Sequence, residues 1–205
     1  YKKIIASINL LKKNHVKTSL HFVILKENSN DVSNYINLAE KLSVNMITFS
    51  NLIPYGCGEK MKDKMLTPDE LKIVYCKISE RVKELEKKGS KLWVRRTRPL
   101  WAILSKKENK NFVGGSCPVG ISTLTILSNG KVMPCRRLPI IIGDLKKQNF
   151  FEIWYESKVL WDIRNKNKIN ACGKCKYLNK CGGCRGLAYI YYGDYMAKDP
   201  QCWLT

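Results

Sequence analysis

The sequence has no long apolar run. Its longest apolar stretches, such as residues 138–142, are far shorter than the roughly 20 residues that a membrane-spanning helix needs. The basic N-terminal segment also lacks the apolar core of a signal peptide. We therefore expect a cytoplasmic protein with no membrane partner.

Acidic residues are few, with 17 Asp and Glu against 37 Lys and Arg, which gives a net charge of +20. Such an excess suits nucleic acid, an anionic membrane or an acidic partner. However, 29 of the basic residues are Lys, scattered along a chain with 16 Asn, as on an ordinary solvated surface. The charge alone therefore assigns no partner.

The nine cysteines form an odd set in what we take to be a reducing compartment, which argues against a disulfide framework. Seven of them fall between Cys117 and Cys202. The net charge is +6 over residues 1–90 and +14 over residues 91–205. This shift predicts two domains, at residues 1–90 and 117–205, joined by a linker at 91–116.

Residues 1–90 alternate between helical and strand periodicity, which predicts an α/β fold with a parallel sheet. We expect strands at 18–25 and 45–52 and helices at 4–11, 32–42 and 68–88. The last helix has Thr67 as N-cap, Pro68 in its first turn and Glu70 to complete a capping box. Because two strands cannot form a covered parallel sheet, we expect this half to be the end of a larger (βα) unit.

Chemistry in barrels of βα units sits at the C-terminal ends of the strands. Those ends are residues 26–28, with Asn28, and 50–58, with Asn51. The second loop contains Pro54, Gly56 and Gly58, so its backbone can approach a ligand closely, although such a sequence is also that of an ordinary turn. Cys57 on this loop is expected to be an isolated thiol, with a position near the active site as the alternative. Cys76 is expected to be a packed side chain.

In the second half, Asn129-Gly130 predicts a hairpin with a type I′ turn between residues 122–127 and 132–134. This hairpin would bring Cys117 and Cys135 to one end of a sheet. A helix is expected over residues 150–164.

Four cysteines then fall within thirteen residues, at Cys172, Cys175, Cys181 and Cys184, with glycines between them. Zinc ribbons use Cys-x2-Cys pairs but usually separate them by some 15–20 residues. The gap of five here, between Cys175 and Cys181, favours an iron–sulfur cluster, which tolerates clustered spacing. Zinc stays open as the alternative.

The cysteine order resembles the seven-cysteine signature of the SPASM domain, a C-terminal extension of many radical S-adenosylmethionine (SAM) enzymes. The likeness extends to the residues between and after the cysteines, among them Gly143-Asp144-Leu145, Cys181-Gly182-Gly183-Cys184-Arg185 and Asp199-Pro200-Gln201-Cys202. Pro54-Tyr55-Gly56-Cys57-Gly58 resembles the loop after the sixth strand of the partial (β/α)6 barrel in that family. The branch with the strongest resemblance contains enzymes of haem and peptide-derived cofactor biosynthesis and peptide maturases.

The resemblance implies two auxiliary 4Fe–4S clusters, one held by Cys172, Cys175, Cys181 and Cys202 and the other by Cys117, Cys135 and Cys184. The fourth iron site of the latter would be open, take a non-cysteine ligand or bind substrate. It further implies that Asn28, Asn51, Pro54, Gly56 and Gly58 lie near SAM.

The family's Cys-x3-Cys-x2-Cys loop, which holds the third 4Fe–4S cluster, and its Gly-Gly-Glu motif are missing from this sequence. We therefore expect a C-terminal fragment that is inactive alone and assign it no catalytic residue. The parent would be a radical SAM oxidoreductase or maturase that abstracts hydrogen with a 5′-deoxyadenosyl radical. Its expected partners are a peptide or anionic tetrapyrrole-type substrate and an electron donor such as a flavodoxin or ferredoxin, with no nucleic acid.

Two other functions compete with this one. A zinc-stabilised module could use the +14 half to bind nucleic acid, but the basic residues form no single stripe and Trp154 and Trp161 fall at helical-core spacing. A ferredoxin-like electron carrier would not need the α/β half. Iron content and the salt dependence of nucleic-acid binding separate these hypotheses.

Overall fold

The computed structural model describes residues 1–104, 112–114 and 117–204, and only the backbone of 112–114. The chain divides into two compact units. The first unit comprises Tyr1–Leu52, Asp63–Thr97 and Ile103–Gly115, and the second comprises Ile53–Lys62, Arg98–Ala102 and Ser116–Thr205. Within the described ranges, no helix is both long and apolar enough to cross a membrane.

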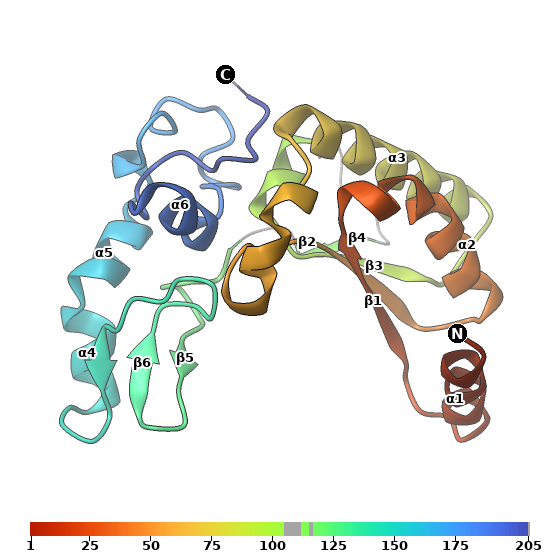
Figure 1. Cartoon of the computed structure of the whole chain (residues 1–205), viewed down its shortest axis with the longest axis horizontal. Coiled ribbons are helices and arrows are strands. Elements are labelled where there is room, and N and C mark those ends of the chain that lie inside the picture. The colour runs from red at the N-terminus through yellow and green to blue at the C-terminus, as the bar shows by residue number, and fades with distance from the viewer. Residues whose placement is uncertain (105–111, 115–116, 205) are drawn as a thin grey trace. The chain divides into compact units, whose positions relative to one another are not determined.

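The first unit contains a four-stranded parallel sheet in the order β1-β2-β3-β4. Its helices α2 and α3 lie on one face of that sheet (Figure 1). This arrangement confirms the predicted α/β class. The strands are β1 Ser19–Ile24, β2 Met46–Asn51, β3 Trp93–Arg96 and β4 Phe112–Gly114, and the helices are α1 Lys2–Lys13, η1 Lys26–Asp31, α2 Val32–Lys41 and α3 Pro68–Lys87.

Helix α3 begins where its capping signals predict. The Thr67 backbone N–H donates to Glu70 Oε2 at 2.8 Å, and the Glu70 N–H donates to Thr67 Oγ1 at 3.3 Å. Pro68 occupies the first turn, where its missing N–H costs nothing. The apolar residues that recur at helical spacing along this helix are buried: Leu71, Val74, Ile78, Val82 and Leu85.

Aromatic side chains join α2 to the sheet. Phe22 and Phe49 are register partners on β1 and β2, and the Tyr35 ring of α2 lies 4.7 Å from the first ring centroid and 5.8 Å from the second. On the same face, Tyr75 of α3 donates to Asn51 Oδ1 at 3.0 Å. Because side chains alternate along a strand, His21 and Ser50 belong to the face opposite these helices.

The segment 91–116 is more than a linker, because it adds β3 and β4 to the sheet of the first unit. It also contains the short 3-10 helix η3 Pro99–Ile103, of which all but Ile103 belongs to the second unit. In β3 the buried Val94 lies between two exposed residues, Trp93 and Arg95. Four residues with one buried apolar side chain carry too short an alternation to be recognised from sequence.

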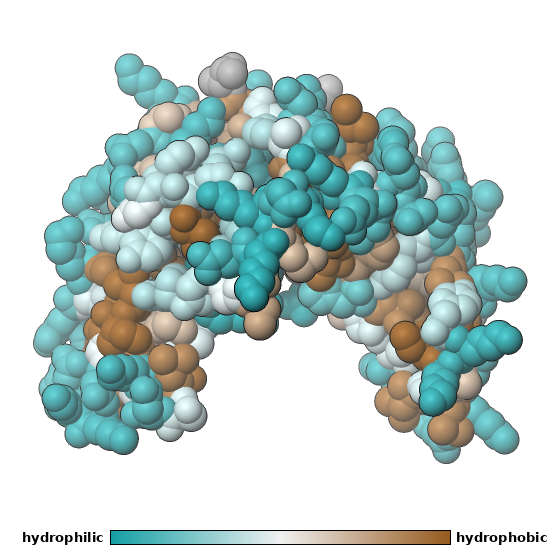
Figure 2. Space-filling model, viewed as in Figure 1, coloured by the Kyte–Doolittle hydropathy of each residue, from teal (hydrophilic) through white to brown (hydrophobic). Residues whose placement is uncertain are grey.

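Helix α1 buries less of its apolar stripe than the spacing suggests. Ile8 is 5% exposed, whereas Ile4 and Leu11 are 63% and 40% exposed. Figure 2 shows hydrophobic side chains at the surface near this helix. A hollow of about 400 Å³ separates part of α1 from the end of α2.

The second unit contains a small antiparallel sheet in the order β5-β6-β7 and several short helices. Its buried cluster of Val119, Leu138 and Ile163 packs against Cys117 and Cys135. The strands are β5 Thr125–Ile126, β6 Lys131–Met133 and β7 Gly143–Asp144; the helices are α4 Phe150–Glu156, α5 Lys158–Arg164, η4 Lys166–Lys168 and α6 Arg185–Tyr192, and η2 Gly56–Lys64 crosses the boundary between the units.

The hairpin forms as predicted, but its turn is not type I′. That turn needs positive φ at both central residues, and of this pair only Gly130 has it, with φ +89°. Instead, Gly130 N–H donates to Leu127 O at 2.9 Å and Leu127 N–H donates to Lys131 O at 2.8 Å. The loop therefore has three residues and ends in a left-handed glycine, the arrangement of a type I turn with a bulge.

The predicted helix over residues 150–164 is two helices. Ser157 ends α4 in an extended conformation, with φ −64° and ψ 112°, and caps α5 by accepting the Leu160 N–H. The chain bends there because the serine side chain replaces the hydrogen bond that a continuous helix would make.

Candidate metal centres

The seven cysteines after residue 116 all belong to the second unit. We group them into two sets by which thiol charges influence the pKa of which cysteine. Burial raises the pKa of Cys117, and the charges of Cys184 and Cys135 raise it further. Burial also raises the pKa of Cys135, and the charge of Cys184 adds to that effect. We call Cys117, Cys135 and Cys184 the first set.

Cys172, Cys175, Cys181 and Cys202 make up the second set. Burial raises the pKa of Cys181 to about 11, and after the neighbouring Asp199 the charges of Cys202 and Cys172 contribute. Burial also raises the pKa of Cys172 and Cys202, and each of these thiols feels the charge of Cys175. Metal binding would have to displace protons from these thiols.

Backbone N–H groups point at sulfur two residues after three of the cysteines. Arg137 N–H donates to Cys135 Sγ and Gly183 N–H to Cys181 Sγ, each at 3.4 Å, and the Val119 N–H bonds Cys117. Such hydrogen bonds favour the thiolate over the thiol. These turns therefore suit cysteines that act as metal ligands.

The turn between Cys181 and Cys184 depends on two glycines in the left-handed region, Gly182 at φ +70° and Gly183 at φ +62°. A Cβ on Gly183 would lie 2.7 Å from Arg185 Nη2 and 2.9 Å from Asp199 Cβ. Only glycine fits this position without displacing its neighbours. The turn places Cys181 in the second set and Cys184 in the first.

Asp199 connects the segments that carry the two sets. Its side chain is 1% exposed and accepts hydrogen bonds from the N–H of Cys184 at 2.8 Å and of Gln201 at 2.9 Å. It also pairs with Arg98, which is fully buried, at 3.0 Å between Nη2 and Oδ2. Sequence reasoning missed Arg98, since its partner lies 101 residues further along the chain.

Cationic side chains lie near both sets, and the second set also has the buried carboxylate of Asp199 beside it. Arg98, Arg136 and Arg137 act on the first set, whereas Arg185 and Lys198 act on the second. Burial, together with the charges of Arg98 and Arg136, lowers the pKa of Arg137. An anion bound between the thiols of the first set would offset this repulsion.

The donor set fits iron–sulfur clusters by its chemistry: clustered free cysteines, N–H groups directed at sulfur, and buried cations for an anionic centre. Arg185 in particular has buried Nε and Nη2 groups with no hydrogen-bond partner among the described residues. Within that same part of the chain, no three His, Cys, Asp or Glu side chains are placed to hold a single metal ion.

The residues predicted near SAM belong to both units. Asn28 lies in η1, which follows β1, and Asn51 is the last residue of β2; both side chains make hydrogen bonds within the fold. Asn28 Oδ1 accepts the Leu25 N–H at 2.8 Å and Nδ2 donates to Val23 O at 3.0 Å, and Asn51 Oδ1 accepts from Tyr75. Pro54, Gly56 and Gly58 belong to the second unit. Gly56 has φ +60° and open space where a Cβ would be.

Sequence reasoning also missed a polar row on the sheet face opposite α2 and α3. His21, Thr48 and Arg95 are in register across β1, β2 and β3, and His21 Nε2 lies 2.7 Å from Ser50 Oγ. The polar residue between Leu20 and Phe22 was the available signal, because alternation places His21 on the other face.

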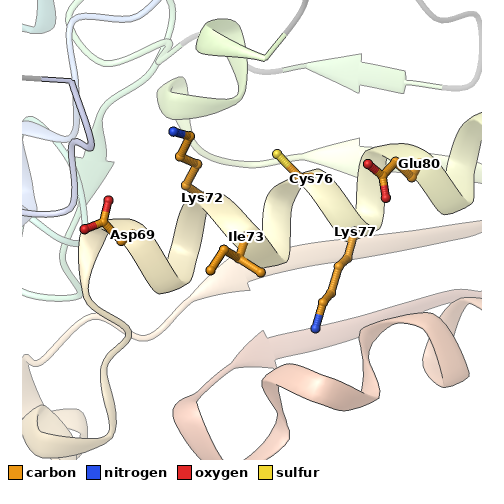
Figure 3. Close-up of a pocket in the computed structure, with 6 residues that line it drawn as sticks. All are labelled: Asp69, Lys72, Ile73, Cys76, Lys77 and Glu80. Carbon is orange, nitrogen blue, oxygen red and sulfur yellow. The ribbon is translucent and has the colours of Figure 1, made fainter.

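Cys57 is exposed and Cys76 partly buried on α3. A hollow of about 450 Å³ beside Cys76 is lined by Asp69, Lys72, Ile73, Cys76, Lys77 and Glu80, all from this one helix (Figure 3). A single helix cannot enclose a ligand, and we assign this surface no role.

Comparison with known proteins identifies the cysteine-rich part. Residues 117–184 match the SPASM family, described as an iron-sulfur cluster-binding domain. Along 98% of its length the chain is 27% identical to an AdoMet-dependent heme synthase of Methanosarcina barkeri. Along nearly its whole length the chain is therefore similar to a radical SAM protein, and residues 117–184 carry the SPASM match.

Two further matches extend beyond the SPASM domain. The chain is 26% identical over 91% of its length to the PqqA peptide cyclase of Rhizobium meliloti. The structure of Streptococcus suis SuiB bound to S-adenosylmethionine covers 99% of the chain with a TM-score of 0.71 at 16% identity, which confirms the predicted radical SAM/SPASM fold. The chain spans 60%, 49% and 49% of these three proteins, so about half of each.

Proposed function

We propose that the second unit binds two auxiliary 4Fe–4S clusters, one at the second set, Cys172, Cys175, Cys181 and Cys202, and one at the first set, Cys117, Cys135 and Cys184. The observation that carries this proposal is that six of these seven buried or half-buried thiols lie in the stretch that matches an iron-sulfur cluster-binding domain, with Cys202 following it. The charges that the thiols exert on one another support their assignment to two groups.

When bound, such clusters supply one-electron transfer. The chain's own residues exclude water from the thiols, direct N–H groups at sulfur and surround both sets with positive charge. These N–H groups and cations favour reduction of the clusters, because they stabilise the negative charge that an added electron brings.

We further propose that the whole protein is a cytoplasmic radical SAM enzyme that modifies a peptide or a tetrapyrrole-type anion and receives electrons from a flavodoxin or ferredoxin. The names of the relatives support both substrate classes, since one is a heme synthase and another a peptide cyclase. The open space beside the Gly56 backbone would let SAM approach it closely.

Anaerobic reconstitution with iron and sulfide tests the cluster proposal. We expect roughly seven to eight iron per chain, depending on whether the site with three cysteines keeps its fourth iron. Cys172→Ser should lose about half of that iron, whereas Cys76→Ser, a matched control outside both sets, should lose none. A colourless protein with one or two zinc ions would contradict the proposal.

A further inference from the structure

Arg185 is a buried cation at the first position of α6, directly after Cys184. Its side chain is 4% exposed. One nitrogen, Nη1, donates to the carbonyl oxygens of Tyr195 at 2.8 Å and Ala197 at 2.7 Å. These two bonds fix the plane of the guanidinium, because the five N–H groups of arginine form a rigid fork.

The other two nitrogens of that fork are unused. Nε and Nη2 of Arg185 are buried and have no hydrogen-bond partner within the described part of the chain. A buried N–H of a charged group without an acceptor is costly, so native structures almost always provide one. The missing acceptor should be an anion, since the donor is a cation.

The unused side of the guanidinium lies against the turn of the second set. Nη2 is so close to Gly183 that a Cβ there would be 2.7 Å away. Gly183 in turn donates its N–H to Cys181 Sγ at 3.4 Å, so the guanidinium lies beside a turn that contacts a sulfur of the second set. The other cation near this set, Lys198, is partly buried and already donates to Leu204 O.

We propose that Arg185 donates its Nε and Nη2 hydrogen bonds to sulfur of the cluster held by the second set, and thereby makes that cluster easier to reduce. This inference rests on the proposed function. A fixed, buried donor interacts with the added negative charge in a medium that screens it weakly, whereas the first set has other cations around it. Substitution of Arg185 should therefore change the reduction potential of only one of the two clusters.

The test is an anaerobic titration of the reconstituted full chain with dithionite and redox mediators, followed by electron paramagnetic resonance. The variants are Arg185→Gln, which removes the charge, and Arg185→Lys, which keeps the charge without the fork. Lys198→Gln is the matched control, since it removes a charge near the same set whose ammonium group already has an acceptor.

For Arg185→Gln we expect the one-electron reduction constant of one cluster to fall about tenfold, which is about 59 mV. Arg185→Lys should retain all iron and lower the constant about threefold, and Lys198→Gln should change it less. The signal that shifts must be the one that Cys172→Ser lacks.

Several outcomes would overturn the inference. One such outcome is an Arg185→Gln variant that keeps its full iron content and has the same reduction potential as the Lys198→Gln control. If Arg185→Gln misfolds and loses iron, the Arg185→Lys variant becomes the test. A reduction potential equal to that of the wild type in Arg185→Lys would then overturn the inference. A wild-type chain that takes up no iron refutes the proposed function itself, whereas loaded chains that differ in nothing refute only the role of Arg185.

Discussion

The buried Arg98–Asp199 pair should be among the most sensitive contacts of the second unit. The two side chains are 0% and 1% exposed, and Asp199 also accepts the amides of Cys184 and Gln201. In Asp199→Asn the remaining oxygen can still accept, but the charge of Arg98 loses its buried counterion. Breaking such a pair typically costs about 3–5 kcal/mol.

A double-mutant cycle separates the ion pair from the rest of the site. We expect Asp199→Asn and Arg98→Met each to destabilise the chain by about 3–5 kcal/mol. The double variant should cost about 1–3 kcal/mol less than the sum, because neither charge is then left buried without the other. Urea unfolding followed by tryptophan fluorescence measures all four chains.

Hydrogen exchange provides a local readout in the same experiment. Asp199→Ala removes both acceptor oxygens, so the amides of Cys184 and Gln201 should exchange about 5- to 150-fold faster, the equivalent of about 1–3 kcal/mol for each buried donor. Asp199→Asn should preserve much of their protection. Strictly additive single and double variants, or unchanged exchange in Asp199→Ala, would refute the reasoning.

Two further predictions concern the helices. Thr67→Ala removes the N-cap acceptor of α3 and should destabilise the first unit by about 1 kcal/mol in urea, whereas Thr67→Ser should be near neutral; equal losses in both would exclude the cap as the cause. Hydrogen bonds from Lys158 and Tyr195 hold the pKa of Asp162 below its ordinary value. The stabilisation of the fold by ionised Asp162 is therefore fully present above the pKa of an unfolded-chain Asp, near 3.9, and is lost as the pH falls through the lower pKa of the folded chain. The stability difference between wild type and Asp162→Asn, measured on the iron-free chain from pH 7 down to pH 3, should shrink toward the acid end, and a difference that is constant with pH would contradict this assignment.

Local patterns in the sequence were sufficient for the elements whose causes are local. The α3 cap, the stripe of that helix and the hairpin at Gly130 each depend on residues a few positions apart. The predicted turn type was wrong because Asn-Gly suits both a two-residue type I′ loop and a three-residue loop that ends in a left-handed glycine, and the local sequence does not decide the loop length. Likewise, the sequence around Ser157 is compatible with a continuous helix, and only the structure shows that its side chain caps α5.

Long-range contacts were out of reach. The Arg98–Asp199 pair, the short strand β3 and the register of His21 with Thr48 and Arg95 depend on segments far apart in the sequence. The two cysteine sets were implied by family resemblance, since spacing alone left zinc open. The roles of Asn28 and Asn51 stay predictions, because their side chains are bonded within the first unit.

The short turn from Cys181 to Cys184 has a consequence for electron flow. Three residue steps of extended chain span at most about 10–11 Å, so the backbones of these two cysteines can never be farther apart than that. With one cysteine in each proposed cluster, the two centres are joined by a covalent tether of Gly182 and Gly183. If both clusters are bound as proposed, an electron would pass between them over a distance set by one small loop, whatever motion the remainder of the protein undergoes.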